Sequence, residues 1–343
     1  MAVLLLLIVF FLIRYIGISK NRKVPEKGIN ESLYVDINGT RQWINIYGKD
    51  LNNPLLLYLH GGPGSSTSLY DYAFTRKWSD VYTVVTWDQR GCGKSYDERR
   101  GPETITYDNM MQDGKEMTEF LLKSLSKEKL TLLGHSWGSL FGANLAMQHP
   151  EYYDAYIGTG QCIDIDENER LFREAAEKWT EGDKEGQAML EKLHFKEDDP
   201  MEYLRARNGL MKKHRYDMMK DGTDYNMFAA VLFNPNYQIF DLFKYVLYAR
   251  KSAQPYLDFL LGDLAKFSLL GRYKYEVPFY NINGDRDYQT SYQLACDYFE
   301  RVEAPYKKMY VMEDATHGLL ESRSEEFSKI VHDIDRIQKE DRN

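Results

Sequence analysis

"LTLLGHSWGSLFGANLAMQ", from Leu130 to Gln148, places the motif Gly-x-Ser-x-Gly between an apolar run and a helical pattern. The run LTLL is typical of a buried strand, and LFGANLAMQ predicts a helix that ends before Pro150. The bare motif occurs by chance in roughly one chain in ten of this length, where it marks only a glycine-rich helix start. Between a strand and a helix, it predicts a sharp turn that presents Ser136 as a nucleophile at the edge of a sheet.

Further apolar runs on both sides of this motif alternate with helical patterns. A hairpin is predicted around Asn38-Gly39, and strands are predicted at PLLLYL, YTVVTWDQ, YDAYIGTG, VPFYNING and YKKMYVME. Helices are predicted over residues 69–78, 109–125 and 291–301 and from Glu321 onward. Strands that alternate with helices form a parallel sheet with helices on both faces. The sequence therefore predicts an α/β fold with a doubly wound, mostly parallel sheet.

The alternation is interrupted by a long helical insertion. From residue 161 to residue 272 the sequence is helical in pattern and rich in charge, Tyr and Met. An insertion of this size is on the scale of a cap or lid over a site. We divide the chain into an apolar segment (1–19), a linker (20–30), an α/β core (31–160 and 273–343) and a helical cap (161–272).

The N-terminal segment AVLLLLIVFFLIRYIGI, Ala2 to Ile18, is nearly all apolar and is at the short end of what spans a bilayer. Its basic residues follow the apolar run, whereas a secretory signal carries them before it. We therefore predict a single-pass membrane anchor, with a cleaved signal peptide and a secreted protein as the alternative. The positive-inside rule then favours a cytoplasmic domain.

Bulk composition excludes several classes of protein. The 343 residues carry a net charge of −8, so we expect no nucleic-acid partner. The three cysteines, Cys92, Cys162 and Cys296, are too far apart in sequence to indicate a disulfide framework or a metal cluster.

A serine hydroxyl needs an oriented base. In folds with this turn, an acid and then a histidine follow the serine in chain order. His317 lies in the loop MEDATHGLL directly after the last predicted strand, which is where the base belongs. The other histidines after Ser136 lie in predicted helices or in the insertion: His149, His194, His214 and His332.

Two carboxylates compete for the acid in INGDRDYQT. Asp285 follows Gly284 and is in a position to shape the turn itself. Asp287 lies further out, where it can reach back to His317. We predict Asp287 as the acid, with the role of fixing the imidazole tautomer and stabilising the imidazolium.

An oxyanion formed at the site needs backbone N–H donors. The residue after the nucleophile, Trp137, provides one, and the glycine loop HGGPG after an early strand provides the other, for which we choose Gly62. His60, at the end of that strand, is predicted to be structural.

The stretch VVTWDQRGCGKSY ends in Gly93-Lys94-Ser95, like a phosphate-binding loop. That motif needs a glycine five residues before Gly93, and Asp88 occupies the position. We therefore predict a tight structural turn and no nucleotide binding.

Together these motifs resemble the α/β-hydrolase superfamily, and within it the serine hydrolases of the proline iminopeptidase-like branch. The matching stretches are HGGPG, WDQRGCGKS, GHSWGS, the GDRD acid and the TH base, in family order. The sequence departs from the family at His135, where members that cleave N-terminal proline commonly carry glycine.

The resemblance also implies that acidic cap residues hold the free ammonium of a substrate. CIDIDENER supplies such residues, and we take Glu167 and Glu169 as the candidates. The same acidic run favours a helix start, so a purely structural role is the alternative.

We therefore expect a serine hydrolase with a Ser136–Asp287–His317 triad that acts through an acyl-enzyme and needs no metal or organic cofactor. The resemblance implies an aminopeptidase that acts on small peptides. A carboxylesterase or lipase-like hydrolase is the alternative, and a non-catalytic binding protein on the same scaffold is the third. A serine nucleophile argues against dehalogenase or epoxide-hydrolase chemistry.

Overall fold

The computed structural model describes residues 2–242, 244–245, 256, 259–260 and 262–342. Its strands are β1 (Ile29–Ile37), β2 (Thr40–Gly48), β3 (Leu55–Leu59), β4 (Thr83–Asp88), β5 (Leu130–His135), β6 (Tyr153–Thr159), β7 (Phe279–Gly284) and β8 (Lys307–Met312). Its longer helices are α1 (Ala2–Asn21), α3 (Tyr107–Ser124), α4 (Trp137–Gln148), α5 (Ile165–Trp179), α7 (Pro200–Lys213), α11 (Tyr292–Arg301) and α13 (Ser324–Arg342). Its short ones are α2 (Tyr72–Thr75), α6 (Lys184–Leu190), α8 (Met227–Leu232) and α12 (Leu319–Ser322).

The eight strands form one sheet in the order β1-β2-β4-β3-β5-β6-β7-β8. β2 runs antiparallel to both of its neighbours, and the pairs from β4 to β8 are parallel. The predicted hairpin joins β1 to β2, and Asn38 and Gly39 both have positive φ (43° and 70°), as such a two-residue turn requires. The mostly parallel α/β sheet that the sequence predicts is confirmed.

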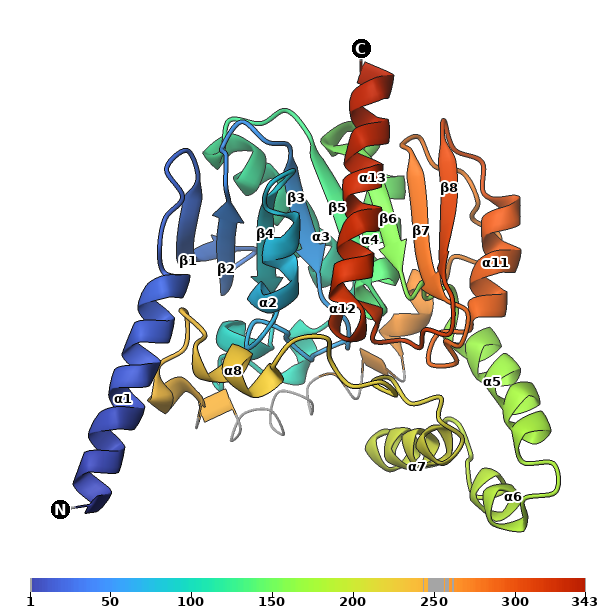
Figure 1. Cartoon of the computed structure of the whole chain (residues 1–343). Coiled ribbons are helices and arrows are strands. Elements are labelled where there is room, and N and C mark those ends of the chain that lie inside the picture. The colour runs from blue at the N-terminus through green and yellow to red at the C-terminus, as the bar shows by residue number, and fades with distance from the viewer. Residues whose placement is uncertain (1, 243, 246–255, 257–258, 261, 343) are drawn as a thin grey trace.

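Helices cover both faces of the sheet because its central strands are apolar on both sides. Along β3, Leu55, Leu57 and Leu59 pack on the face covered by α3 and α4. Leu56 and Tyr58 pack on the opposite face, with α2 and α13 (Figure 1). Alternating side chains along a strand point to opposite faces, so a continuous apolar run is what such a strand needs.

Two predicted helices differ from those observed. Residues 69–78 form only the short α2 and a 3₁₀ turn, Arg76–Trp78, which together carry Phe74 and Trp78 into the core. The C-terminal helix is divided into α12 and α13, which are separated at Arg323.

Between β6 and β7 the described part of the chain forms α5, α6, α7, α8 and a 3₁₀ helix, Asp263–Phe267. These helices lie below the edge of the sheet at which the parallel strands end (Figure 1). The loops that follow β3, β4, β5, β6 and β7 therefore face the inserted helices.

Helix α1 projects from the domain on the same side as α8 (Figure 1). Judged by length and composition alone, the stretch Val3–Asn21 could cross a bilayer. A signal sequence near the N-terminus has the same properties, so the chain has one N-terminal apolar helix that suits either role.

Candidate active site

Ser136 lies on a strained turn between β5 and α4. Its backbone has φ 56° and ψ −123°, a conformation that non-glycine residues rarely adopt. Such strain persists only where the surrounding structure imposes it, and it is concentrated at functional sites. The predicted strand–turn–helix geometry is present, and Ser136 lines the cavity described below.

The two glycines of the motif allow the turn to pack closely. A β-carbon on Gly134 would lie 2.1 Å from the carbonyl oxygen of Gly138. A β-carbon on Gly138 would lie 2.1 Å from the carbonyl oxygen of Leu59 in the neighbouring strand. Both distances are far inside van der Waals contact, so neither position accepts a larger residue without movement of the backbone.

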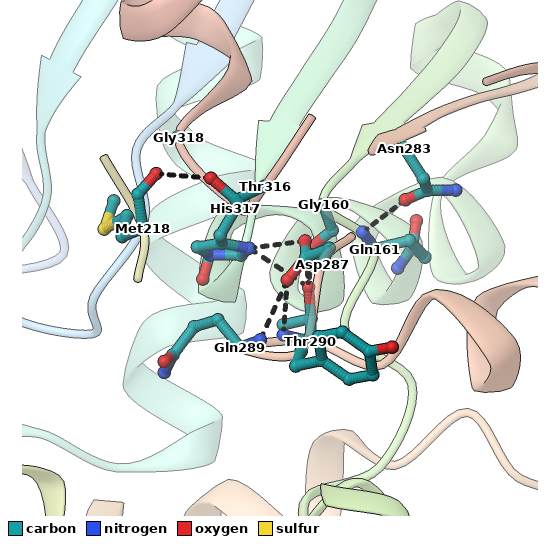
Figure 2. Close-up of polar contacts among 12 residues, drawn as sticks. Gly160, Gln161, Met218, Asn283, Asp287, Gln289, Thr290, Thr316, His317 and Gly318 are labelled. Atoms are coloured by element: carbon teal, nitrogen blue, oxygen red, sulfur yellow. Dashed lines mark hydrogen bonds and ion pairs between the residues drawn. The ribbon is translucent and has the colours of Figure 1, made fainter. Parts of the chain in front are cut away.

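His317 and Asp287 form a buried pair (Figure 2). Nδ1 of His317 lies 2.7 Å from Oδ2 of Asp287, and both side chains are at most 2% exposed. Because the carboxylate can only accept, Nδ1 carries the proton and Nε2 is left as the basic nitrogen. This is the tautomer that a general base for a serine requires.

The loop after β7 holds the carboxylate of Asp287 in place. Oδ1 accepts hydrogen bonds from the backbone N–H groups of Gln289 (2.9 Å) and Thr290 (3.0 Å). The Thr290 hydroxyl lies 3.0 Å from Oδ2 and 3.0 Å from the carbonyl oxygen of Gly160 (Figure 2). Asp285, the alternative acid, has no described contact with His317.

His135 lies directly beside the imidazole of His317. The two rings are 4.8 Å apart at their centroids and tilted by 32°. Nε2 of His135 is 3.0 Å from the backbone carbonyl of His317, so Nε2 is the protonated nitrogen. Burial and the neighbouring His317 lower the pKa of His135 to about 3, which keeps this ring neutral.

Gly62 and Trp137 line the same cavity as Ser136, as the oxyanion prediction requires. Trp137 is the first residue of α4, where backbone N–H groups have no acceptor within the helix. Its indole nitrogen donates to Oε1 of Gln89 (2.8 Å), and Gln89 in turn donates to the carbonyl of His60 (3.2 Å). The glycine loop and the start of α4 are thus fixed to each other.

The loop after β4 is held together by hydrogen bonds to Asp88. Asp88 is buried and accepts hydrogen bonds from Ser66, from Ser68 (3.0 Å) and from the backbone N–H of Lys94 (2.7 Å). A β-carbon on Gly93 would lie 2.3 Å from this carboxylate. Burial raises the pKa of Asp88 to about 6.

The contacts of His60 favour the structural role that the sequence predicts. It is 2% exposed, its Nδ1 lies 2.7 Å from the carbonyl oxygen of Gly61, and its Nε2 faces the backbone N–H of Gln89. Burial lowers the pKa of His60 to about 4, so this ring is neutral near pH 7.

A cavity of about 260 Å³ lies between the sheet edge and the inserted helices. Its floor contains Ser136 and Trp137, and its walls are mostly apolar. The apolar and aromatic side chains among the described lining residues are Pro63, Trp137, Leu140, Cys162, Ile165, Phe195, Pro200, Met201, Tyr203, Leu204, Tyr256, Leu260 and Leu264. This volume suits a small molecule or the end of a peptide.

Glu169 is the acidic residue that α5 directs into this cavity. Its Oε2 accepts from the Tyr203 hydroxyl (2.6 Å) and from Nε of Arg207 (3.1 Å). Among the residues that the structure describes, Oε1 has a single long contact, 3.4 Å, to the amide of Asn168. Glu167, the other cap candidate, is not among the described lining residues and pairs with Arg170 on the surface (2.6 Å).

Arg207 connects the cap to the loop that holds Asp287. Its guanidinium is fully buried over the ring of Phe172 and donates to Tyr288 O (2.9 Å) and Gln289 Oε1 (2.8 Å). Asn168 on α5 binds the same loop through Gln289 O (3.1 Å). Helices α5 and α7 therefore support the acid loop from the cap side.

Sequence reasoning missed Thr290, Asn168, Tyr203 and Arg207. The sequence contains one signal for Tyr203 and Arg207. These residues share a buried face of α7 with Leu210 and Met211, and an arginine within an apolar helical stripe needs a buried partner.

Two known peptidases are similar to this chain in sequence. "Probable aminopeptidase YbaC" of Bacillus subtilis (strain 168) is 28% identical over 306 residues, 86% of this chain and 93% of that protein. "Proline iminopeptidase" of Lactobacillus helveticus is 28% identical over 196 residues, 53% of this chain and 60% of that protein. The chain is thus distantly related to these peptidases, as the motifs indicated.

Solved structures share the fold. A proline iminopeptidase-related protein from Thermus thermophilus has a TM-score of 0.59 at 20% identity, and the match covers 88% of this chain and 95% of that one. Epoxide Hydrolase A from Mycobacterium thermoresistibile has a TM-score of 0.58 at 18% identity, with 89% and 98% covered.

The family model described as "alpha/beta hydrolase fold" matches residues 54–323. This range contains β3 to β8, the turn at Ser136 and the His317–Asp287 pair. The chain therefore belongs to the α/β-hydrolase family.

Proposed function

We propose that the protein is a serine hydrolase in which Ser136, His317 and Asp287 form the catalytic triad. The observation that carries this proposal is the buried His317–Asp287 pair, whose imidazole lies beside the ring of His135, the residue before the strained Ser136. In the first step Ser136 Oγ attacks the substrate carbonyl carbon while Nε2 of His317 takes the hydroxyl proton. The carbonyl oxygen becomes an oxyanion, which the N–H groups of Trp137 and Gly62 stabilise.

The intermediate then collapses to an acyl-enzyme. The bond from the carbonyl carbon to the leaving group breaks, and the imidazolium of His317 returns its proton to the leaving amine or alcohol. A water molecule, deprotonated by Nε2, attacks the carbonyl carbon of the acyl-enzyme. The bond from this carbon to Ser136 Oγ then breaks, His317 returns the proton to Oγ, and the acid is released. Asp287 remains ionised throughout and stabilises the imidazolium.

As substrate class we propose small peptides with a free N-terminus. Distant relationship to peptidases and the acidic side chain of Glu169, which lines the cavity together with Asp198, support this choice. Oε2 of Glu169 is already bound by Tyr203 and Arg207, whereas Oε1 remains for a substrate ammonium. The ammonium would form a charge-assisted hydrogen bond there.

The apolar walls of the cavity favour a second candidate, an esterase for short acyl chains. If the protein is an esterase, Glu169 serves only as the structural partner of Arg207. The two candidates differ in whether the amine of the substrate contributes to turnover.

We also propose that α1 anchors the protein in a membrane, because its apolar residues are exposed in the structure.

The test uses the whole chain in mild detergent with four substrates: prolyl and alanyl arylamides, an N-blocked alanyl arylamide and a short acyl ester. An aminopeptidase cleaves the free arylamides and loses activity when the amine is blocked or in Glu169→Gln. Ester cleavage that is indifferent to the amine would overturn the peptidase proposal. Ser136→Ala is the control, and activity retained in that variant would overturn the triad.

A further inference from the structure

The turn between α6 and α7 brings a basic side chain to the catalytic cavity. Lys196 carries the one positive charge among the lining residues that the structure describes, beside the carboxylates of Glu169 and Asp198. Ser136 lines the same cavity. Neither the triad nor the proposed oxyanion hole uses this lysine.

The backbone holds Lys196 at the cavity. Its φ is 69°, a left-handed conformation that is uncommon for a residue other than glycine. Hydrogen bonds close the turn around it: the N–H of His194 donates to Oδ2 of Asp198 (2.9 Å), and the N–H of Asp198 donates to the carbonyl of His194 (3.0 Å). Asp199 then caps α7 by accepting from the N–H of Met201 (3.0 Å). The turn therefore fixes the position of the backbone, and the long side chain of Lys196 keeps its rotational freedom.

The ammonium group of Lys196 has an exchangeable partner. Nζ lies 2.5 Å from Oδ1 of Asp166 on the first turn of α5, and the two side chains are 47% and 62% exposed. Ion pairs this exposed contribute little to stability, because water screens them and both side chains lose freedom. A carboxylate that enters the cavity can therefore replace Asp166 at small cost.

The position of Asp166 gives the spacing between the two charged ends of the cavity. Asp166 and Glu169 are three residues apart on α5, so their β-carbons lie about 5–6 Å from each other on one side of the helix. Lys196, held at Asp166, is thus about one helical turn from Glu169. An extended chain spans at most about 3.6 Å per residue, so two residues reach about 7 Å. A dipeptide with free ends carries opposite charges at this spacing.

Resting on the aminopeptidase function proposed above, we propose that Lys196 binds the C-terminal carboxylate of a dipeptide substrate. Glu169 then holds the N-terminal ammonium, and the carbonyl between the two ends is offered to Ser136. The carboxylate of Asp198 disfavours a further anion in the cavity, although its Oδ2 already accepts from His194. A dipeptide satisfies this limit, because it has no net charge and each of its ends meets the opposite sign.

The test compares alanyl-leucine with alanyl-leucine amide, which differ in the charge at the C-terminus, on the whole chain in mild detergent. We expect the wild type to have a KM about tenfold lower for the free dipeptide, the size of one charge-assisted hydrogen bond. Lys196→Met should abolish this preference, and Lys196→Arg, which keeps the charge, should retain it. Lys192→Met, at an exposed lysine outside the described lining residues, is the matched control and should keep the preference.

Asp166→Asn separates substrate binding from a structural role of the ion pair. If Lys196 exchanges Asp166 for the substrate, this variant frees the ammonium, and its KM for the free dipeptide stays the same or falls. A loss of the preference in Asp166→Asn as large as in Lys196→Met would show that the ion pair shapes the cavity, and would overturn the inference. Equal KM values for the dipeptide and its amide in the wild type would overturn it as well.

Binding of the same two compounds to Ser136→Ala, measured by calorimetry, distinguishes this inference from the proposed function. If the wild type cleaves no arylamide while Ser136→Ala binds the free dipeptide more tightly than the amide, the peptidase proposal fails and the carboxylate site stands. If the arylamides are cleaved and neither measurement distinguishes the dipeptide from its amide, the peptidase proposal stands and the carboxylate site is refuted.

Discussion

Replacing Asp287 by asparagine tests the triad most directly, because the loop dictates how the new side chain must point. The backbone N–H groups of Gln289 and Thr290 both donate to Oδ1 of Asp287. In Asp287→Asn these donors retain the amide oxygen, so the NH₂ group must face His317. Nδ1 then becomes an acceptor, the proton moves to Nε2, and the imidazole can no longer accept a proton from Ser136.

The size of the effect follows from the cost of restoring the productive tautomer. Turning the amide over loses two hydrogen bonds of about 1 kcal/mol each and leaves buried donors facing donors, at roughly 1–3 kcal/mol more. The sum, about 3–5 kcal/mol, corresponds to a rate loss of roughly 10²–10⁴. The rate of covalent fluorophosphonate labelling at Ser136 measures this loss without knowledge of the natural substrate.

Asp285→Asn is the matched control, since it changes the same functional group two residues away without a described contact to His317. We expect labelling within about twofold of the wild type, because Asp285 is partly exposed and the change leaves Asp287 and its two backbone donors in place. If Asp287→Asn labels within tenfold of the wild type while remaining folded by circular dichroism, the tautomer argument fails. If both variants lose labelling rate equally, the conformation of the loop, and not the carboxylate of Asp287, determines the reactivity of Ser136.

Three further changes test other parts of the structure. His135→Leu removes the donor to the carbonyl oxygen of His317 and should lower kcat roughly tenfold or more. His135→Gln keeps a donor, so its kcat should stay within a few-fold of the wild type. Equal losses of kcat in the two variants would contradict a positioning role for His135. Burial raises the pKa of Glu321 to about 7 in the folded state, so this group favours folding below its unfolded pKa near 4.5, and the contribution is lost as pH rises through 7. The free energy of unfolding, measured in urea, should therefore rise in Glu321→Gln relative to the wild type by up to about 3 kcal/mol between pH 5 and pH 8. A difference between the two proteins that stays constant over this pH range would contradict the prediction. Gly138→Ala should lower the free energy of unfolding by about 3 kcal/mol or more, and a thermal midpoint equal to that of the wild type would show that Leu59 can move away.

The fold and the position of the serine could be predicted from sequence because their signals are local. The apolar runs name the strands, and parallel strands bring their ends to one sheet edge. Chain order and loop position then identify His317, and the structure places Asp287 rather than Asp285 against it. The catalytic roles themselves remain predictions for the experiments above.

The cap contacts could not be predicted, because they join residues far apart in the chain. The acidic residues at the start of α5 have different roles, which no local pattern predicts. Asp164 caps the helix (2.9 Å to the N–H of Glu167), and Glu169 lines the cavity. Arg14 is more than two hundred residues from Tyr237, its partner. Which residues of a helical insertion meet the core is decided by packing, and periodicity reports only which side of each helix is apolar.

The attachment of α1 has a practical consequence for how the protein should be prepared. Removing the first 23 residues would give a chain that is easier to purify, yet it would also take away Arg14, Asn21 and Arg22. Water can replace these donors at the backbone carbonyls of Phe233, Pro235 and Tyr237, but it cannot replace the packing of α1 on the ring of Phe233. Kinetic constants from a shortened chain would then describe an enzyme whose inserted segment has lost its contacts with α1. Nanodiscs or micelles that hold the intact chain are the appropriate medium for the first assays.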